Sequence, residues 1–136
     1  MKALVVDKSS TMRSILHRIL SMREFEVTEA GSVLTALDLM QRTGSPDIAL
    51  VQWSGNDTGT LELLSRLRNE LSHRTRIILL AEAELGAREL KQVLMAGADD
   101  YLVKPFTSLQ IDKKLEQAGL TLQWSRSVDH GEISCR

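Results

Sequence analysis

The stretch ALVVDKSSTMRSIL, residues 3–16, joins an uninterrupted apolar run to the pattern of an amphipathic helix. Its first four residues are all apolar, which is typical of a strand covered on both faces. Apolar residues then recur at helical spacing: Met12, Ile15, Leu16, Ile19 and Leu20. Ser9, Ser10 or Thr11 can cap the start of this helix. The stretch therefore predicts a strand, a short loop and a helix in direct succession.

The rest of the chain repeats this alternation. The further apolar runs are Phe25–Ala30, Ile48–Val51, Ile77–Leu80 and Tyr101–Val103. In the first of these, apolar and polar residues alternate, which indicates a more exposed strand. The second helix is predicted to open after Ser32 and to stop at Gly44, and the fifth begins with a capping-box pattern, Thr107 to Gln110. Strictly alternating strands and helices imply parallel strands joined by right-handed crossovers.

Length and composition are those of a single globular domain. The chain has 136 residues, of which 43% are apolar and 26% are charged, so it can bury a core without disulfides. We predict one domain over residues 1–119 and a tail over residues 120–136. The tail is either disordered or docked on the domain through Leu120, Leu122 and Trp124.

Charge and hydropathy exclude several classes of partner. The net charge of −1 gives no general attraction to nucleic acid or to an anionic membrane. No stretch approaches the roughly 18 apolar residues of a membrane span. The basic run RLRNELSHRTR, residues 66–76, has no interleaved aromatic residue, which favours a solvated helix end over a nucleic-acid patch. A single cysteine, Cys135, suits a reducing compartment, and we expect a cytoplasmic protein.

Three stretches carry a family resemblance. They are ALVVDKSSTMRSIL at 3–16, PDIALVQW at 46–53 and AGADDYLVKPF at 96–106. Together, in this order and spacing, they resemble the CheY-like receiver domain of two-component signalling, over residues 2 to about 118. The resemblance implies an α/β flavodoxin-like (βα)5 three-layer sandwich, with a parallel sheet in the order 2-1-3-4-5. In this family the phosphorylation site lies at the carboxyl ends of strands 1, 3, 4 and 5.

The resemblance assigns roles to individual residues at those strand ends. Asp7 matches the first of two acids that hold Mg²⁺, but Lys8 stands in place of the second. Gln52 stands in place of the aspartate that accepts the phosphoryl group. Ala81 stands in place of a serine or threonine. The site that the resemblance implies is therefore incomplete at three positions.

Strand 5 and the residues after it follow the family pattern more closely. Lys104 matches the family lysine, and Pro105 follows it, with a cis bond expected between them. Tyr101 matches the aromatic switch position. The usual contact face of the family, helix 4, strand 5 and helix 5, corresponds to roughly residues 84–118 here.

The replaced residues change the chemistry of the site. A glutamine amide is uncharged and a poor nucleophile, so Gln52 cannot hold a stable acyl phosphate. Three carboxylates and one lysine give the family site a net charge of −2, which Mg²⁺ neutralises, whereas Asp7, Lys8 and Lys104 sum to +1. Glu82 can offset part of this charge. We therefore expect weak or absent Mg²⁺ binding and no other cofactor, and the positive balance makes phosphate or sulfate a candidate ligand.

Two side chains near this site carry expectations of their own. Lys8 either pairs with Asp7 near the vacated metal position or points into solvent. Trp53, one residue beyond Gln52, is expected to cover the mouth of the pocket.

These residues favour one function and leave two alternatives open. The leading hypothesis is a phosphorylation-independent pseudo-receiver, not an enzyme, which binds a histidine kinase, another receiver or an output protein. A homodimer through the helix 4, strand 5 and helix 5 face is a candidate assembly. The alternatives are an active receiver phosphorylated on a substitute carboxylate, for which Asp57 is the candidate, and a purely structural dimerisation domain.

Overall fold

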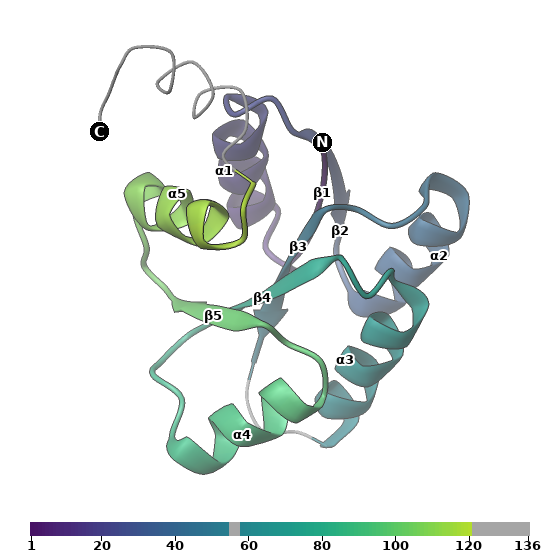
Figure 1. Cartoon of the computed structure of the whole chain (residues 1–136), viewed down its shortest axis with the longest axis vertical. Coiled ribbons are helices and arrows are strands. Elements are labelled where there is room, and N and C mark those ends of the chain that lie inside the picture. Colours follow the sequence, from purple (N-terminus) through teal and green to yellow (C-terminus); the bar gives the residue numbers. More distant parts are fainter. Residues whose placement is uncertain (55–57, 121–136) are drawn as a thin grey trace. The chain divides into compact units, whose positions relative to one another are not determined.

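Five strands alternate with five helices in the part of the chain that the structure describes (Figure 1). The structure is a computed structural model, and it describes residues 1–54 and 58–120. The strands are β1 (Lys2–Val6), β2 (Glu26–Ala30), β3 (Ile48–Trp53), β4 (Arg76–Ala81) and β5 (Asp100–Val103). The helices are α1 (Ser10–Ser21), α2 (Val33–Thr43), α3 (Thr58–Glu70), α4 (Ala87–Met95) and α5 (Ser108–Gln117).

The strands form one parallel sheet in the order β2-β1-β3-β4-β5, which confirms the predicted topology. Strands β1, β3 and β4 are almost wholly buried, as their continuous apolar runs predict. Strand β2 lies at one edge of the sheet and is only partly buried, in agreement with its alternating sequence. Because all strands run the same way, their carboxyl ends meet at one edge of the sheet.

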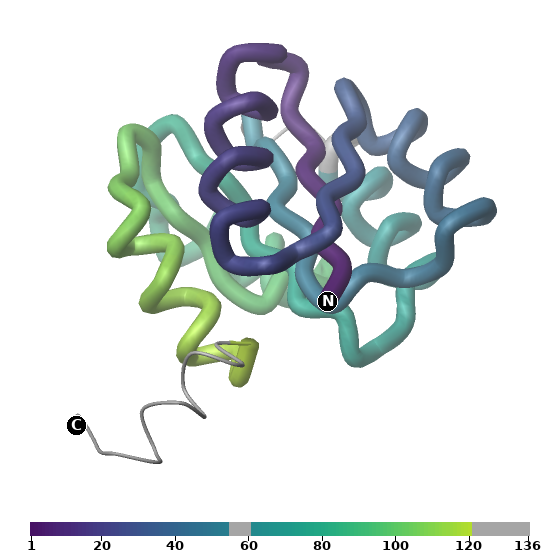
Figure 2. The backbone as a smooth tube through the Cα atoms, turned by 90° about the horizontal axis from the view of Figure 1, so that it is seen from above, coloured from purple at the N-terminus to yellow at the C-terminus, as the bar shows by residue number. Residues whose placement is uncertain are grey.

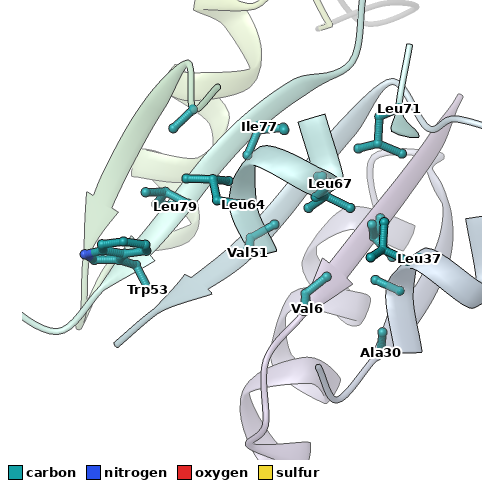
Figure 3. Packing of buried hydrophobic residues seen from close by; sticks show 14 of the residues in the cluster. Val6, Ala30, Leu37, Val51, Trp53, Leu64, Leu67, Leu71, Ile77 and Leu79 are labelled. Carbon is teal, nitrogen blue, oxygen red and sulfur yellow. The ribbon is translucent and has the colours of Figure 1, made fainter. Parts of the chain in front are cut away.

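Helices cover both faces of this sheet. Helix α1 lies on one face, and α2, α3 and α4 lie on the other (Figure 1). Figure 2 shows α1 and α2 on opposite sides of β1. The face under α2, α3 and α4 carries a core cluster, which includes Val6, Ala30, Leu37, Val51, Leu64, Leu67, Leu71, Ile77 and Leu79 (Figure 3).

The predicted helix ends are confirmed where their caps can be seen. The Ser9 side chain accepts a hydrogen bond from the backbone N–H of Met12, and Ser32 caps α2 in the same way. Gly44 ends α2 with a φ of 82°, a conformation that glycine adopts without strain. Thr107 caps α5 in a complete capping box, as predicted.

The chain divides into two compact units, residues 1–105 and the part from Phe106 onward. The first contains the whole sheet and α1 to α4, and the second contains α5. The predicted domain boundary after residue 119 stays a prediction. The docking residues Leu122 and Trp124, and also Cys135, lie outside the described residues.

Arg68 is the centre of a hydrogen-bond network at the amino-terminal ends of β4 and β5. Its guanidinium donates to the carbonyl oxygens of Gly97, Ser72 and Thr75, and to Asp99 Oδ2 at 2.9 Å. Asp99 Oδ2 also accepts the backbone N–H of Ile77. The basic run at 66–76 thus contributes its second arginine to the structure of the fold. Among the helices seen over 1–54 and 58–120, none has the length and apolar character to cross a membrane.

Candidate functional site

Five residues at the carboxyl edge of the sheet form the candidate site, here called the carboxyl-edge site: Asp7, Lys8, Gln52, Ala81 and Lys104. Asp7 and Lys8 follow β1, Gln52 is the next-to-last residue of β3, Ala81 ends β4, and Lys104 follows β5. Strand register aligns these ends, since Val6 pairs with Val51 and Ala81 pairs with Val103. The backbone N–H of Lys104 donates to the carbonyl of Ala81 at 2.8 Å. All five residues belong to the first unit.

A buried ion pair occupies the centre of the site. The side chain of Asp7 is 0% exposed, and its Oδ2 lies 2.9 Å from Nζ of Lys104, which is 13% exposed. The other carboxylate oxygen accepts the backbone N–H of Ser9 at 2.9 Å. Glu82, 64% exposed, brings a second carboxylate to 3.4 Å from the same ammonium. A buried carboxylate needs such partners, because burying a charge without them is costly.

Gln52 acts as a neutral hydrogen-bond acceptor between two elements. Its side chain is half-buried, and its Oε1 accepts the backbone N–H of Lys8 at 3.0 Å. This bond connects β3 to the loop between β1 and α1. The amide thus stabilises the edge of the sheet without adding charge.

Of the two positions predicted for Lys8, the structure has the one in solvent. Its side chain is exposed, and over the described ranges of the chain it forms no ion pair with Asp7, whose carboxylate faces Lys104 instead. Two carboxylates, of Asp7 and Glu82, therefore surround one ammonium, and Lys8 adds a second positive charge at the rim. With Glu82 counted, the local charges balance, which weakens the argument for a bound phosphate or sulfate.

The prediction for Trp53 is wrong. Its side chain is 3% exposed and packs in the core cluster under α2, α3 and α4, so it does not cover the site (Figure 3). The reason is that β3 extends to Trp53, two residues beyond the predicted run, and successive strand residues point to opposite faces. Gln52 therefore faces the site, while Trp53 faces the core. The indole N–H of Trp53 donates to Glu89 Oε2 at 2.8 Å.

Tyr101 is held by a carboxylate of the segment before α4. Its hydroxyl donates to Glu84 Oε1 at 2.8 Å. This hydrogen bond, together with partial desolvation and the negative charge of Glu84, raises the pKa of the Tyr101 hydroxyl above its usual value of 10.0. The Lys104–Pro105 peptide bond is cis, which confirms the expectation from the sequence.

Arg13 is a site residue that sequence reasoning missed. Its Nη1 donates to the carbonyl oxygen of Asp7 at 2.6 Å, and its Nε lies 3.3 Å from Glu29 Oε1. Glu29 Oε2 in turn lies 2.7 Å from Nδ1 of His17. The contacts of Glu84 and Glu89 were missed as well. The one hint for Arg13 is its place near the start of the helix that follows Asp7, which brings its side chain back toward that loop.

Within 1–54 and 58–120, no three histidine, cysteine, aspartate or glutamate side chains are placed together to hold a metal ion. Asp57, the candidate substitute acceptor, lies outside the described residues.

Comparison with known proteins identifies the family. The model of the response regulator receiver domain matches residues 3–116. A chemotaxis protein CheY homolog of Campylobacter jejuni is 35% identical over 117 residues, which cover 85% of this chain and 90% of that protein. Chemotaxis protein CheY-3 of Vibrio cholerae is 34% identical over 120 residues, covering 86% and 90% of the two chains.

Solved structures agree on the fold. Chemotaxis protein CheY4 of Vibrio cholerae matches with a TM-score of 0.75 at 24% identity, over 86% of this chain and 97% of that one. A response regulator of Burkholderia pseudomallei, solved with a phosphorylated aspartic acid, calcium ion and citrate, matches with a TM-score of 0.72 at 25% identity. That match covers 98% of this chain and 76% of the other.

The family model spans most of the chain, and the curated relatives are matched over nearly their whole length. The sheet order and the alternation of strands and helices agree with the fold of the solved receiver structures. The chain therefore belongs to the response regulator receiver domains, the family of CheY-like proteins of two-component signal transduction.

Proposed function

We propose that this receiver domain works without aspartyl phosphorylation and acts in signalling as a protein-interaction module. The observation that carries the proposal is Gln52 at the carboxyl end of β3, with its Oε1 bonded to the backbone of Lys8. From the family resemblance, this is the position at which the phosphoacceptor is expected. An amide there is uncharged, a poor nucleophile and already used as a structural acceptor.

The carboxylates that surround Gln52 do not offer a ready substitute. Asp7 is wholly buried, and its two oxygens face Lys104 and the backbone of Ser9. A carboxylate in this position cannot approach a phosphodonor without breaking a buried ion pair. Glu82 is exposed, but its carboxylate lies 3.4 Å from the same Lys104 ammonium.

The donor set does not fit Mg²⁺. Magnesium prefers carboxylate and water oxygens in octahedral geometry. Here the family's second acid is Lys8, and the first, Asp7, is neutralised by Lys104 at 2.9 Å. A divalent cation would have to displace that ammonium and lie near the positive charge of Lys8. We propose that Mg²⁺ binds weakly or not at all and that no phosphoryl step depends on it.

A protein partner is the natural ligand for the surface of α4 and β5. Helix α4 exposes Leu94 and Met95, and the basic residues Arg88 and Lys91 are exposed beside them. An apolar centre with charged neighbours is typical of a protein contact. We propose a histidine kinase, another receiver or an output protein as the partner.

The proposal is tested by intact mass after incubation with acetyl phosphate and Mg²⁺. The unchanged chain is expected to gain no phosphoryl group. The matched variant carries Lys8→Asp and Gln52→Asp, which restore both missing carboxylates, and it is expected to gain one. Phosphorylation of the unchanged chain would contradict the proposal.

Asp57→Asn separates the alternatives if the unchanged chain is labelled. Loss of the label in this variant would establish a substitute acceptor and an active receiver. For the structural alternative, sedimentation over a wide concentration range measures self-association. A stable dimer that binds no other protein of the signalling system would favour a dimerisation domain over our proposal.

A further inference from the structure

Three glutamates between β4 and the first turn of α4 each contact a donor group from the sheet. The segment, residues 82–89, is here called the β4–α4 latch. Glu82 lies 3.4 Å from Nζ of Lys104, Glu84 accepts the hydroxyl of Tyr101, and Glu89 accepts the indole N–H of Trp53. The second and third contacts are both 2.8 Å long, and their glutamates lie five residues apart in the segment. The contact of Glu84 connects the segment to β5, and the contact of Glu89 connects it to β3.

Helix α4 is otherwise weakly held. Its N-cap residue, Gly86, offers no side-chain cap, and Val93 is the one residue of its nine that is fully buried. Helix α2, by comparison, begins with the Ser32 cap and buries three residues. A helix with a small buried face gains little stability from packing. Its position therefore depends more on polar contacts at its start.

Glu89 provides the firmer of the two anchors. The Trp53 ring is 3% exposed and packed in the core, so its N–H needs a partner, and Glu89 supplies a charged acceptor. Glu89 is the third residue of α4 and lies in its first turn. A carboxylate there also interacts favourably with the helix dipole. This contact connects the start of α4 to a buried ring of the core.

Glu84, which is nearer to β4 than Glu89 is, joins the segment to the proposed partner-binding surface. Its carboxylate meets Tyr101 in β5, and the ring of Tyr101 packs against the core cluster. The residue at the end of β4, Ala81, has a methyl group that cannot donate or accept a hydrogen bond. The carboxylate of Glu84 thus supplies a polar contact to Tyr101 that needs no phosphoryl group.

We propose that Glu84 and Glu89 act together to hold the β4–α4 latch and α4 in one position, and so fix the partner-binding surface of α4 and β5. This inference rests on the proposed function, because it states how that surface is set in a receiver without a phosphoryl trigger. Since the two contacts restrain one short segment, breaking one loosens the other.

The test follows the Trp53 indole N–H by NMR hydrogen exchange, in a Trp124→Phe background that removes the second tryptophan. Glu84→Ala leaves Glu89 intact, yet it is expected to speed exchange of the Trp53 indole about fivefold, the effect of one lost hydrogen bond on an opening equilibrium. Glu84→Gln keeps an acceptor for Tyr101 and is expected to restore most of the protection. Glu70→Ala removes an exposed glutamate of α3 and is expected to change nothing.

Tyr101→Phe removes the same hydrogen bond from its other side, and it serves as a second variant in case Glu84→Ala has a folding defect. It removes the hydroxyl alone, so it is expected to speed indole exchange as much as Glu84→Ala does, and the double variant is expected to add nothing. Unchanged indole exchange in both single variants would overturn the inference, because the Tyr101 contact would then be isolated. Failure of the proposed function is seen separately, as phosphoryl mass on the unchanged chain, whereas the latch is judged by exchange alone.

Discussion

Removing the ammonium of Lys104 tests the buried ion pair at the centre of the carboxyl-edge site. Lys104→Met keeps the length and apolar stem of the side chain but leaves the Asp7 carboxylate, 0% exposed, without its cation. Breaking one partner of a buried pair costs about 3–5 kcal/mol, because an uncompensated charge stays in the interior. The neighbouring carboxylate of Glu82, 3.4 Å from the lost ammonium, adds repulsion instead of compensation. The variant is therefore expected to lose about 3–5 kcal/mol of unfolding free energy.

The assay is urea unfolding at neutral pH, followed by Trp53 fluorescence in the Trp124→Phe background. The matched control, Asp7→Leu with Lys104→Met, replaces both charges by apolar groups. Such a replacement is often neutral or stabilising, so the double variant is expected to recover most of the loss. A cost below about 1 kcal/mol for Lys104→Met, the value of an exposed pair, would show that the Asp7 carboxylate reaches solvent. A double variant as unstable as the single one would show that the loss comes from packing.

Three further predictions concern other parts of the fold. Gly97→Ala is expected to lower the free energy of unfolding by about 1–3 kcal/mol, because φ is 120° there and a Cβ would lie 2.6 Å from Arg68 Cβ. An unchanged melting temperature would contradict this prediction. Ser32→Ala is expected to lower the free energy of unfolding by about 1 kcal/mol, since α2 loses its cap. Amide hydrogen exchange that speeds up only in other helices, and not in α2, would contradict this prediction. The Tyr101 hydroxyl is expected to titrate above pH 10.0 in ultraviolet absorbance and closer to it in Glu84→Gln; equal midpoints would contradict the contact. Because the folded pKa is raised, the stability from this contact is present below the usual pKa and is lost as pH rises through the folded value.

Local signals in the sequence predict the elements of the fold well. The uninterrupted apolar runs mark β1, β3 and β4 because both faces of these strands are covered. The caps at Ser32 and Thr107 are hydrogen bonds between residues close together in the chain, so the local sequence predicts them. The sheet order came from the family resemblance, and the observed pairing confirms it.

The prediction for Trp53 was wrong because of a strand end. The apolar run stops at Val51, but β3 continues through Gln52 to Trp53. Hydrogen bonding to β4 extends the strand over a polar residue, since Gln52 pairs with Leu80 and Trp53 with Ala81. The alternation of strand residues then turns the indole to the core.

The hydrogen-bond and ion-pair partners of the site residues come from distant parts of the chain, so no local sequence pattern predicts them. Asp7 and Lys104 are 97 positions apart, and parallel topology brings them together once the strand order is known. The partners of Arg13, Glu84 and Glu89 lie on other elements of the fold. Their pairing depends on side-chain direction and loop path, so sequence periodicity could not reveal it.

The most direct test of the central proposal observes the carboxyl-edge site itself. In a ¹⁵N-labelled chain, the backbone N–H of Lys8 and the side-chain amide of Gln52 are followed by NMR while Mg²⁺ and then beryllofluoride, an acyl-phosphate mimic, are added. Both groups take part in the bond between the β1–α1 loop and β3, so any ligand in the site must perturb them. We predict no saturable shift in the unchanged chain and clear shifts of the Lys8 and Gln52 positions in the Lys8→Asp, Gln52→Asp variant. Saturable shifts of these groups in the unchanged chain would show that the site still binds the metal and the phosphoryl mimic, and would contradict a phosphorylation-independent receiver.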